Sequence, residues 1–134
     1  MTWRLFRRNP LLGALESEVM DIVWTDGDVT VHSVSERLRK PRAYTTVQTT
    51  LERLLKKGIL ARTKQSHAFV YSPRMDRAEY TARVIEKLFP RPTGEAVLSA
   101  FVDLAASADP KNLERLEALI EARRRSNRPG KGKR

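Results

Sequence analysis

The 134-residue sequence contains no cysteine, which excludes disulfide bonds, thiolate metal ligands and cysteine nucleophiles. It also lacks any stretch near the roughly 18 apolar residues that a membrane-spanning helix needs. Residues 1–10 carry arginines but are not followed by an apolar run as long as that of a signal peptide. We therefore expect a cytoplasmic protein that is not inserted in a membrane.

Residues suited to catalysis are also scarce. The only histidines are His32 and His67, and the sequence around them supplies no further ligands for a metal site. A Gly-rich phosphate loop and the G-x-S-x-G and H-E-x-x-H motifs are all absent. The sequence therefore predicts neither an enzyme nor a bound metal or other cofactor.

The net charge of +10 is distributed unevenly. Residues 1–90 contain 16 basic and 10 acidic residues, residues 91–122 contain 3 basic and 6 acidic ones, and residues 123–134 contain 7 basic and no acidic ones. The first segment and the tail should attract polyanions, whereas the segment between them should not. A basic protein binds nucleic acid only where a suitable fold accompanies the charge, so the order of the elements decides the interpretation.

The apolar residues of the first 60 positions recur at helical spacing. This spacing predicts helices over residues 14–25, 31–39 and 45–57. Thr30 fits the N-cap of the second helix, and Gly58 fits the position just after the third.

Beyond Gly58, two short β-prone runs flank residues 65–67 and predict a hairpin. A fourth helix should begin near Asp76, and residues 90–94 form the expected hinge between domains. Two further amphipathic helices follow, the second of them capped by Asp109 with Pro110 in its first turn.

The third predicted helix begins with an unusual composition. Four of the six residues from 45 to 50 are threonine, a poor helix former whose branched β-carbon crowds the preceding turn. Thr45 and Gln48 have the spacing of a capping box. The apolar period of the helix nevertheless outweighs the β-propensity of the threonines, and we infer that the threonines contact something other than this protein.

The outward face of this helix suits the major groove of DNA. Threonine and glutamine side chains can reach base edges there, and cations further along the helix would meet the phosphates. The alternative is an ordinary solvent-exposed face, which would leave the threonines unexplained. The predicted DNA-binding residues are Lys40, Arg42, Tyr44, Thr45, Thr46, Gln48, Thr49, Arg53, Lys56, Arg62 and Lys64.

The order of helices and hairpin predicts a mainly α protein with a small β-hairpin. Its N-terminal part should be a winged helix-turn-helix with the hairpin as the wing, followed by a C-terminal helical element. The expected segments are a basic arm over residues 1–10, the winged helix over 11–89, the helical element over 94–122 and a disordered basic tail over 123–134. The sequence does not place Trp3 either on the domain or in a loose arm.

Four segments then resemble one known family. "LGALESEVMDIVW", "VTVHSVSERL", "AYTTVQTTLERLLKKGIL" and "AFVYSP" are similar to the BlaI/MecI/CopY family of bacterial repressors, continuously over about residues 11–89. The resemblance implies a homodimer whose winged helices bind inverted-repeat operators with TACA/TGTA-like half-sites. It further implies that the C-terminal helices dimerise, through Leu98, Phe101, Leu104, Leu116 and Ile120.

Two departures from the family concern its regulation. The absence of cysteine excludes the copper-sensing mechanism of the CopY type. Penicillinase-type members are inactivated by cleavage of an Asn–Phe bond, where the similar position here reads Ser99-Ala100-Phe101. Ala100 and Phe101 are therefore the candidate cleavage site, with a membrane sensor metalloprotease of the BlaR type as the candidate partner.

Other classes of function remain as alternatives to the repressor. An RNA-binding module usually stacks bases on aromatic side chains, and the hairpin offers only Phe69 and Tyr71, at alternating positions that suit the core better. A winged-helix adaptor for proteins would more often expose an apolar patch than threonines. Non-specific binding of nucleic acid through charge alone is the third alternative, and it is the plainest interpretation of the tail.

Overall fold

The computed structural model describes residues 12–89, 91 and 93–128, and the chain divides into two compact units, one through Leu88 and one from Phe89 onward. Each unit is considered by itself. In the described part of the chain, no helix has the length and apolar character needed to cross a membrane.

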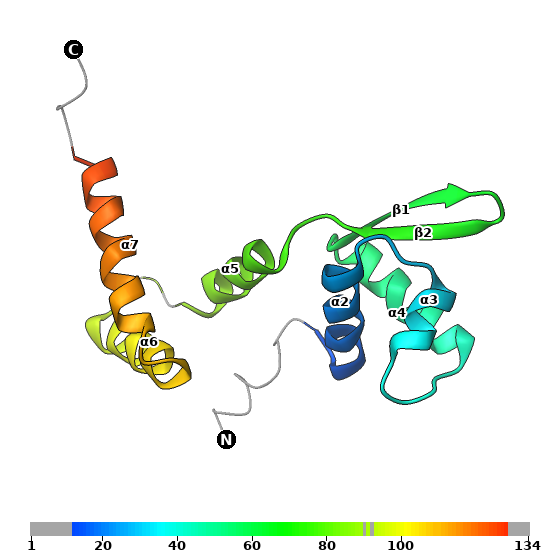
Figure 1. Ribbon diagram of the computed structural model, residues 1–134, viewed down its shortest axis with the longest axis horizontal. Helices are drawn as coiled ribbons and strands as arrows, with labels where there is room; N and C mark the ends of the chain where they lie inside the picture. Colours follow the sequence, from blue (N-terminus) through cyan, green and yellow to red (C-terminus); the bar gives the residue numbers. More distant parts are fainter. Residues whose placement is uncertain (1–11, 90, 92, 129–134) are drawn as a thin grey trace, which may run out of the picture. The chain divides into compact units, whose positions relative to one another are not determined.

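The first unit has the predicted order of elements. Helices α2 (Ala14–Asp26), α3 (Val31–Arg37) and α4 (Tyr44–Lys56) precede strands β1 (Leu60–Gln65) and β2 (Ala68–Pro73), and α5 (Arg77–Leu88) follows (Figure 1). The hairpin extends away from the three helices in Figure 1. The expectation of a mainly α fold with a winged helix-turn-helix is thus confirmed.

The core of this unit forms because one face of each helix is apolar. The apolar residues of α2, α3 and α4 meet one another, and Tyr71 of β2 closes the core with only 1% of its surface exposed. Burying each such side chain stabilises the fold by about 1.5–3 kcal/mol relative to leaving it exposed. The largest completely enclosed side chains are those of Tyr71, Met20, Leu51, Leu54, Leu60, Val19, Val23, Val34 and Val47.

The two strands of the wing pair in an antiparallel register from Leu60 opposite Pro73 to Gln65 opposite Ala68. Val29 adds an isolated bridge to Tyr71, with N–O distances of 2.8 and 2.7 Å. This bridge fixes the base of the wing to the turn between α2 and α3.

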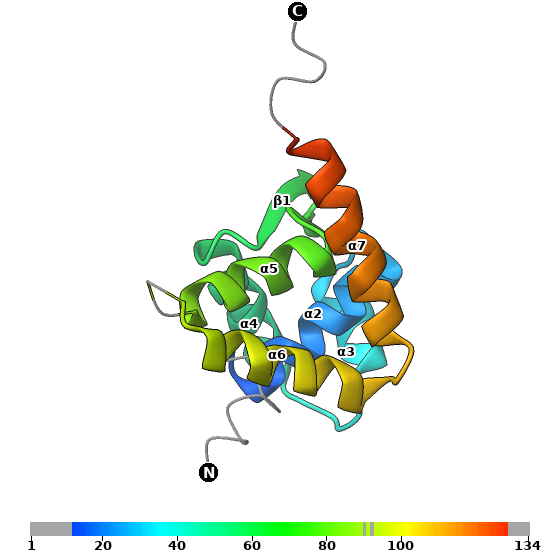
Figure 2. The same ribbon diagram turned by 90° about the vertical axis from the view of Figure 1, so that its left-hand side faces the viewer.

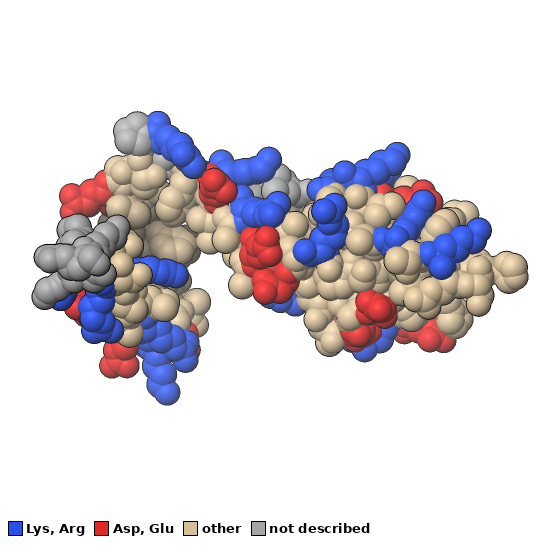
Figure 3. All heavy atoms as spheres, turned by 90° about the horizontal axis from the view of Figure 1, so that it is seen from above, with Lys and Arg blue, Asp and Glu red and all other residues tan. Residues whose placement is uncertain are grey.

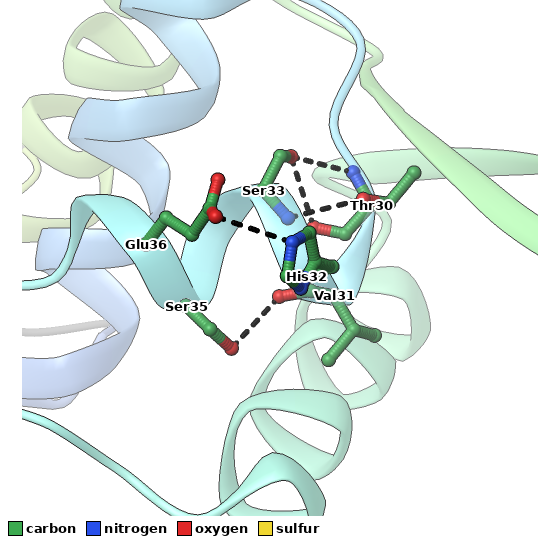
Figure 4. Close-up of polar contacts among 6 residues, drawn as sticks. All are labelled: Thr30, Val31, His32, Ser33, Ser35 and Glu36. Atoms are coloured by element: carbon green, nitrogen blue, oxygen red, sulfur yellow. Dashed lines mark hydrogen bonds and ion pairs between the residues drawn. The ribbon is translucent and has the colours of Figure 1, made fainter.

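Helix α3 begins at the predicted cap. The Thr30 hydroxyl accepts a hydrogen bond from the Ser33 amide at 3.1 Å, and the Ser33 hydroxyl accepts one from the Thr30 amide at 2.9 Å (Figure 4). This reciprocal pair satisfies two amides that have no partner within the helix. The helix ends at Arg37, two residues earlier than predicted, because Leu38 is already extended.

The second unit consists of α6 (Glu95–Ala108) and α7 (Asn112–Ser126), joined by a short turn (Figure 2). The prediction that Asp109 caps the last helix is wrong, because α7 begins only at Asn112 with Lys111 as its N-cap. Asp109 instead ends α6, and its carboxylate accepts a hydrogen bond from the Lys111 amide at 2.9 Å within the turn. Helix α7 continues through Ser126, so residues 123–126, expected in a disordered tail, form its last turn. The predicted N-terminal arm with Trp3 lies outside the described residues, as does the end of the tail over residues 129–134.

Candidate nucleic-acid interface

Helix α4 presents the predicted polar face to solvent. Its apolar side is anchored by Val47, Leu51 and Leu54, none of which has any exposed surface. This anchoring turns the opposite side outward, where Gln48 and Glu52 are half-buried. The exposed residues of that side are Thr45, Thr46, Thr49, Arg53 and Lys56.

One of the four threonines does not fit the expectation of an outside contact. Thr50 is only 4% exposed, and its hydroxyl donates a hydrogen bond to the Thr46 carbonyl at 2.8 Å. It therefore belongs to the inner side of the helix, where the backbone carbonyl satisfies its one polar group. The composition of the stretch suggested an outward role for all four, whereas the angular position of Thr50 decides its actual role.

The start of α4 also differs from the prediction. The helix begins at Tyr44 with Ala43 as its N-cap, and the cap makes no side-chain hydrogen bond. Thr45 thus lies inside the first turn and does not form the predicted capping box with Gln48. At the other end, Gly58 follows the helix with φ +83°, as predicted for a residue at this position.

A groove of about 510 Å³ runs beside the outward face of α4. One wall is formed by the four threonines and Arg53, and the other by the first turn of α2 with Gly13 before it. The groove therefore combines hydroxyl groups, a guanidinium and the start of a helix, all of which are groups that bind phosphate or base edges.

Glu16 also lines this groove, although no sequence motif predicts a functional role for it. Its carboxylate accepts hydrogen bonds from the Gly13 amide at 2.9 Å and from the Lys57 ammonium at 2.8 Å. Burial would raise the pKa of Glu16, but the bonds from Lys57 and Gly13, helped by the charges of Lys57 and Arg53, outweigh it and hold the pKa below its usual value. The spacing from Gly13 to Glu16 before an apolar run is a detectable capping signal, whereas the contact with Lys57 is not.

The loop before α4 and the wing supply the other predicted contacts. Lys40, Arg42 and Tyr44 are exposed, as is Lys64 on β1. Figure 3 shows lysine and arginine side chains, with some acidic ones between them, on the face of the first unit that it presents. The predicted cations are therefore exposed on the loop before α4 and on the wing.

The Arg62 side chain is held in place by two aromatic residues of β2, which the sequence did not indicate. Its guanidinium lies 3.9 Å from the centre of the Phe69 ring, and one of its amino groups is 3.4 Å from the Tyr71 hydroxyl. This cation–π contact holds a half-buried side chain against the wing. Tyr71 is buried, as its position in the strand predicts, whereas the expectation that Phe69 covers the core is wrong, because Phe69 is 38% exposed.

The histidines form no reactive cluster. His32 lies 3.2 Å from Glu36 one turn later on α3, in a pair that is well exposed to solvent (Figure 4). His67 is exposed in the turn between the strands. In the described residues, no group of three or more His, Cys, Asp or Glu side chains could hold a metal ion.

In the second unit, neither α6 nor α7 has a single buried residue. The predicted dimerisation residues Leu98, Phe101, Leu104 and Ile120 are exposed, and Leu116 is half-buried. The candidate cleavage site at Ala100 and Phe101 lies within α6, and the Phe101 ring packs edge-on against Phe89 with centres 5.8 Å apart.

Comparison with known proteins finds similar sequences in one family of repressors. A family model described as "Penicillinase repressor" matches residues 12–122. The penicillinase repressor of Bacillus licheniformis is 34% identical over 55% of this chain, although the match spans only 59% of that protein's length. The transcriptional regulator BlaI of Mycobacterium tuberculosis is 34% identical over 90% of this chain and 92% of its own length. A solution structure of the DNA-binding domain of the repressor BlaI is similar at 33% identity, covering 55% of this chain and 92% of that one with a TM-score of 0.48.

Proposed function

Because the chain belongs to the penicillinase repressor family of DNA-binding transcriptional repressors, we propose that it binds an inverted-repeat operator as a homodimer. The operator would be double-stranded DNA with TACA/TGTA-like half-sites. A bacterial protein that binds such an operator would act in the cytoplasm. Each winged helix would read one half-site, and the α6–α7 pairs would join the two copies.

The outward face of α4 is the observation that carries this proposal. A helix end rich in Thr and Gln matches the donor, acceptor and methyl pattern of the major groove, where a glutamine can pair with adenine and a threonine methyl can pack on thymine. Arg53 and Lys56 follow along the same face, where phosphates of the backbone would pass. The exposed Lys40, Arg42 and Lys64 would hold the flanking phosphates, with Arg62 held beside them on the wing.

The second unit supports the dimer because it cannot bury its own apolar residues. Leu98, Leu104 and Ile120 each expose about half of their surface, at 49%, 52% and 51%. Two amphipathic helices without a buried residue need another apolar surface to cover them. Since this segment also has a net negative charge within a basic protein, a second copy fits it better than DNA does.

We further propose that a membrane sensor metalloprotease could relieve repression by cutting between Ala100 and Phe101. Both residues lie in the second turn of α6, and a protease needs an extended substrate. The cut would therefore require local unfolding of α6, and it would remove the second helix needed for the dimer. Incubation with the protease domain of such a sensor, followed by mass measurement, would detect or exclude the predicted fragments.

A titration with three nucleic acids tests the central proposal. The purified protein is titrated with a TACA/TGTA inverted repeat, a scrambled duplex and single-stranded RNA at several salt concentrations. We expect a preference for the repeat of about 10³-fold or more, the lower end of the usual specific range. Equal and steeply salt-sensitive binding to all three would contradict sequence reading and favour a non-specific cation.

Four single substitutions assign roles on the helix. Gln48→Ala and Thr49→Ala should reduce the discrimination between operator and scrambled DNA, because they remove base contacts. Arg53→Ala and Lys56→Ala should weaken binding to both and flatten the salt dependence, because they remove phosphate contacts. An equal loss for all DNA in the first two variants would overturn the base-reading role of Thr49 and Gln48.

A further inference from the structure

Glu16, which lines the groove beside α4, forms an ion pair with Lys57 that the proposed function does not use. The Lys57 ammonium stands at the end of α4, 2.8 Å from the Glu16 carboxylate, which lines the groove together with Arg53. The Lys57 side chain is 41% exposed and that of Glu16 is 9% exposed, so the cation reaches solvent while the carboxylate lies beneath it. A cation here, next to the surface proposed to face DNA, would ordinarily be expected to bind phosphate.

We propose that Glu16 is a specificity-determining residue, which holds the Lys57 ammonium away from DNA phosphates and thereby limits binding to DNA of random sequence. This inference rests on the proposed function, because it concerns the surface that would meet the operator. Glu16 would not contact DNA itself but would position the Lys57 ammonium, so it is a positioning residue.

The electrostatics of the pair support this role. Non-specific binding arises almost entirely from cations that neutralise phosphates and release counterions. Lys57 already has a carboxylate as its counterion, held in place by a second hydrogen bond from the Gly13 amide, so it contributes little to that release. Operator binding also uses base contacts that fix the register, and it therefore depends less on one additional cation.

Neutralising the carboxylate tests the proposal directly. Glu16→Gln keeps an oxygen for the Gly13 amide but removes the charge that holds Lys57. We expect the affinity for a random duplex to rise. The slope of the logarithm of the binding constant against the logarithm of the salt concentration should steepen by about 0.9, the value for one phosphate contact. Between roughly 50 and 200 mM salt, this corresponds to an additional loss of affinity of about 3.5-fold. The affinity for the operator should rise less, so that the discrimination ratio falls.

Three further variants separate this effect from others. Glu79→Gln removes the same charge from the exposed surface of α5 and should leave the salt dependence unchanged. Lys57→Gln leaves the Glu16 carboxylate without its counter-charge, and the repulsion between this carboxylate and DNA should lower the affinity for a random duplex. The salt dependence should stay nearly unchanged, because Lys57 makes no phosphate contact in the native protein under this proposal. The double variant Glu16→Gln/Lys57→Gln should return the random-duplex affinity to that of the native protein.

The outcomes are distinct from one another. A Glu16→Gln protein that is structurally damaged would bind all DNA more weakly, and this result would overturn the proposal. An unchanged affinity for the random duplex would overturn it as well. A flatter salt dependence in Lys57→Gln would show that Lys57 already contacts phosphate, which would also overturn it, even if Glu16→Gln failed to fold. A native protein without any preference for the repeat would refute the proposed function instead, whereas the comparison of variants on random DNA would still be readable.

Discussion

Glu16 shows at the level of a single residue how a buried charge can be kept. A carboxylate with 9% of its side chain exposed loses most of its hydration, which on its own disfavours ionisation. Two hydrogen-bond donors replace that hydration, one from the Gly13 amide and one from Lys57. The second donor also joins the end of α4 to the start of α2, so the charge connects two helices of the winged domain.

The depressed pKa of Glu16 makes its contribution to stability dependent on pH. Because the pKa in the folded state lies below its usual value of 4.5, the stabilising contribution is complete above that value and is lost as the pH falls through the folded pKa. At pH 7, we expect Glu16→Gln to lower the free energy of unfolding by about 1 kcal/mol, in the range of a partly exposed charged hydrogen bond. Urea unfolding of both proteins at pH 7 and near pH 3 should show the difference shrinking in acid. A difference that stayed constant would place its origin in packing.

Gly58 provides a second test at the residue level. Its φ of +83° is a conformation that side chains rarely adopt, while a β-carbon added there would meet nothing within 4 Å. Gly58→Ala should therefore destabilise the protein by about 1 kcal/mol through backbone strain alone. Gly58→Asn should recover part of the loss, because asparagine tolerates the left-handed region better. Thermal unfolding of the three proteins would measure this order, and equal loss in both variants would exclude strain as the cause.

At the level of elements, α4 begins without a stabilising side-chain cap. Ala43 is a poor N-cap, and the helix starts without a side-chain hydrogen bond. A carboxylate cap would be more stabilising, but it would place a negative charge beside the residues proposed to meet DNA. The absence of a cap is thus consistent with a helix start that has to approach a polyanion.

Two substitutions at Ala43 should separate these effects. Ala43→Ser and Ala43→Asp should each stabilise the protein by about 0.5–1 kcal/mol, because both supply the missing cap. Ala43→Asp should also weaken binding to any duplex, whereas Ala43→Ser should leave it nearly unchanged. Denaturant unfolding and the duplex titration would check both expectations. Equal binding by the two variants would show that the start of α4 does not lie near the phosphates.

The elements themselves could be predicted because their signals are local. The apolar spacing of α4, the Thr30 cap and the β-prone runs around residues 65–67 all lie within short windows of sequence. Composition alone assigned an outside contact to all four threonines, whereas the angular position of Thr50, which is not among the predicted DNA-binding residues, places it on the inner side of α4. The Glu16–Lys57 ion pair could not be predicted from the sequence, because it joins residues 41 positions apart. Such a contact depends on how α2 and α4 pack.

At the level of the whole molecule, the two units differ in what they leave exposed. The first unit buries a core and exposes polar and basic residues, whereas helices α6 and α7 of the second contain no buried residue and expose leucines. This division matches the uneven charge along the sequence, since a self-associating surface should not be strongly cationic. A repressor whose halves read two half-sites would need both properties.

Disrupting the second unit should therefore weaken operator binding without changing the residues proposed to bind DNA. Ile120→Glu places a charge in the exposed apolar face of α7 and should convert the proposed dimer to a monomer, as measured by sedimentation equilibrium. Operator affinity should then fall on the order of 10²–10⁴-fold, because the second half-site is no longer tethered to the first. Ala118→Glu adds the same charge to the opposite side of α7 and should preserve both the dimer and the affinity. If Ile120→Glu remained a dimer with native affinity, the interface would have to lie outside this face of α7, and the leucines of α6 would require another partner.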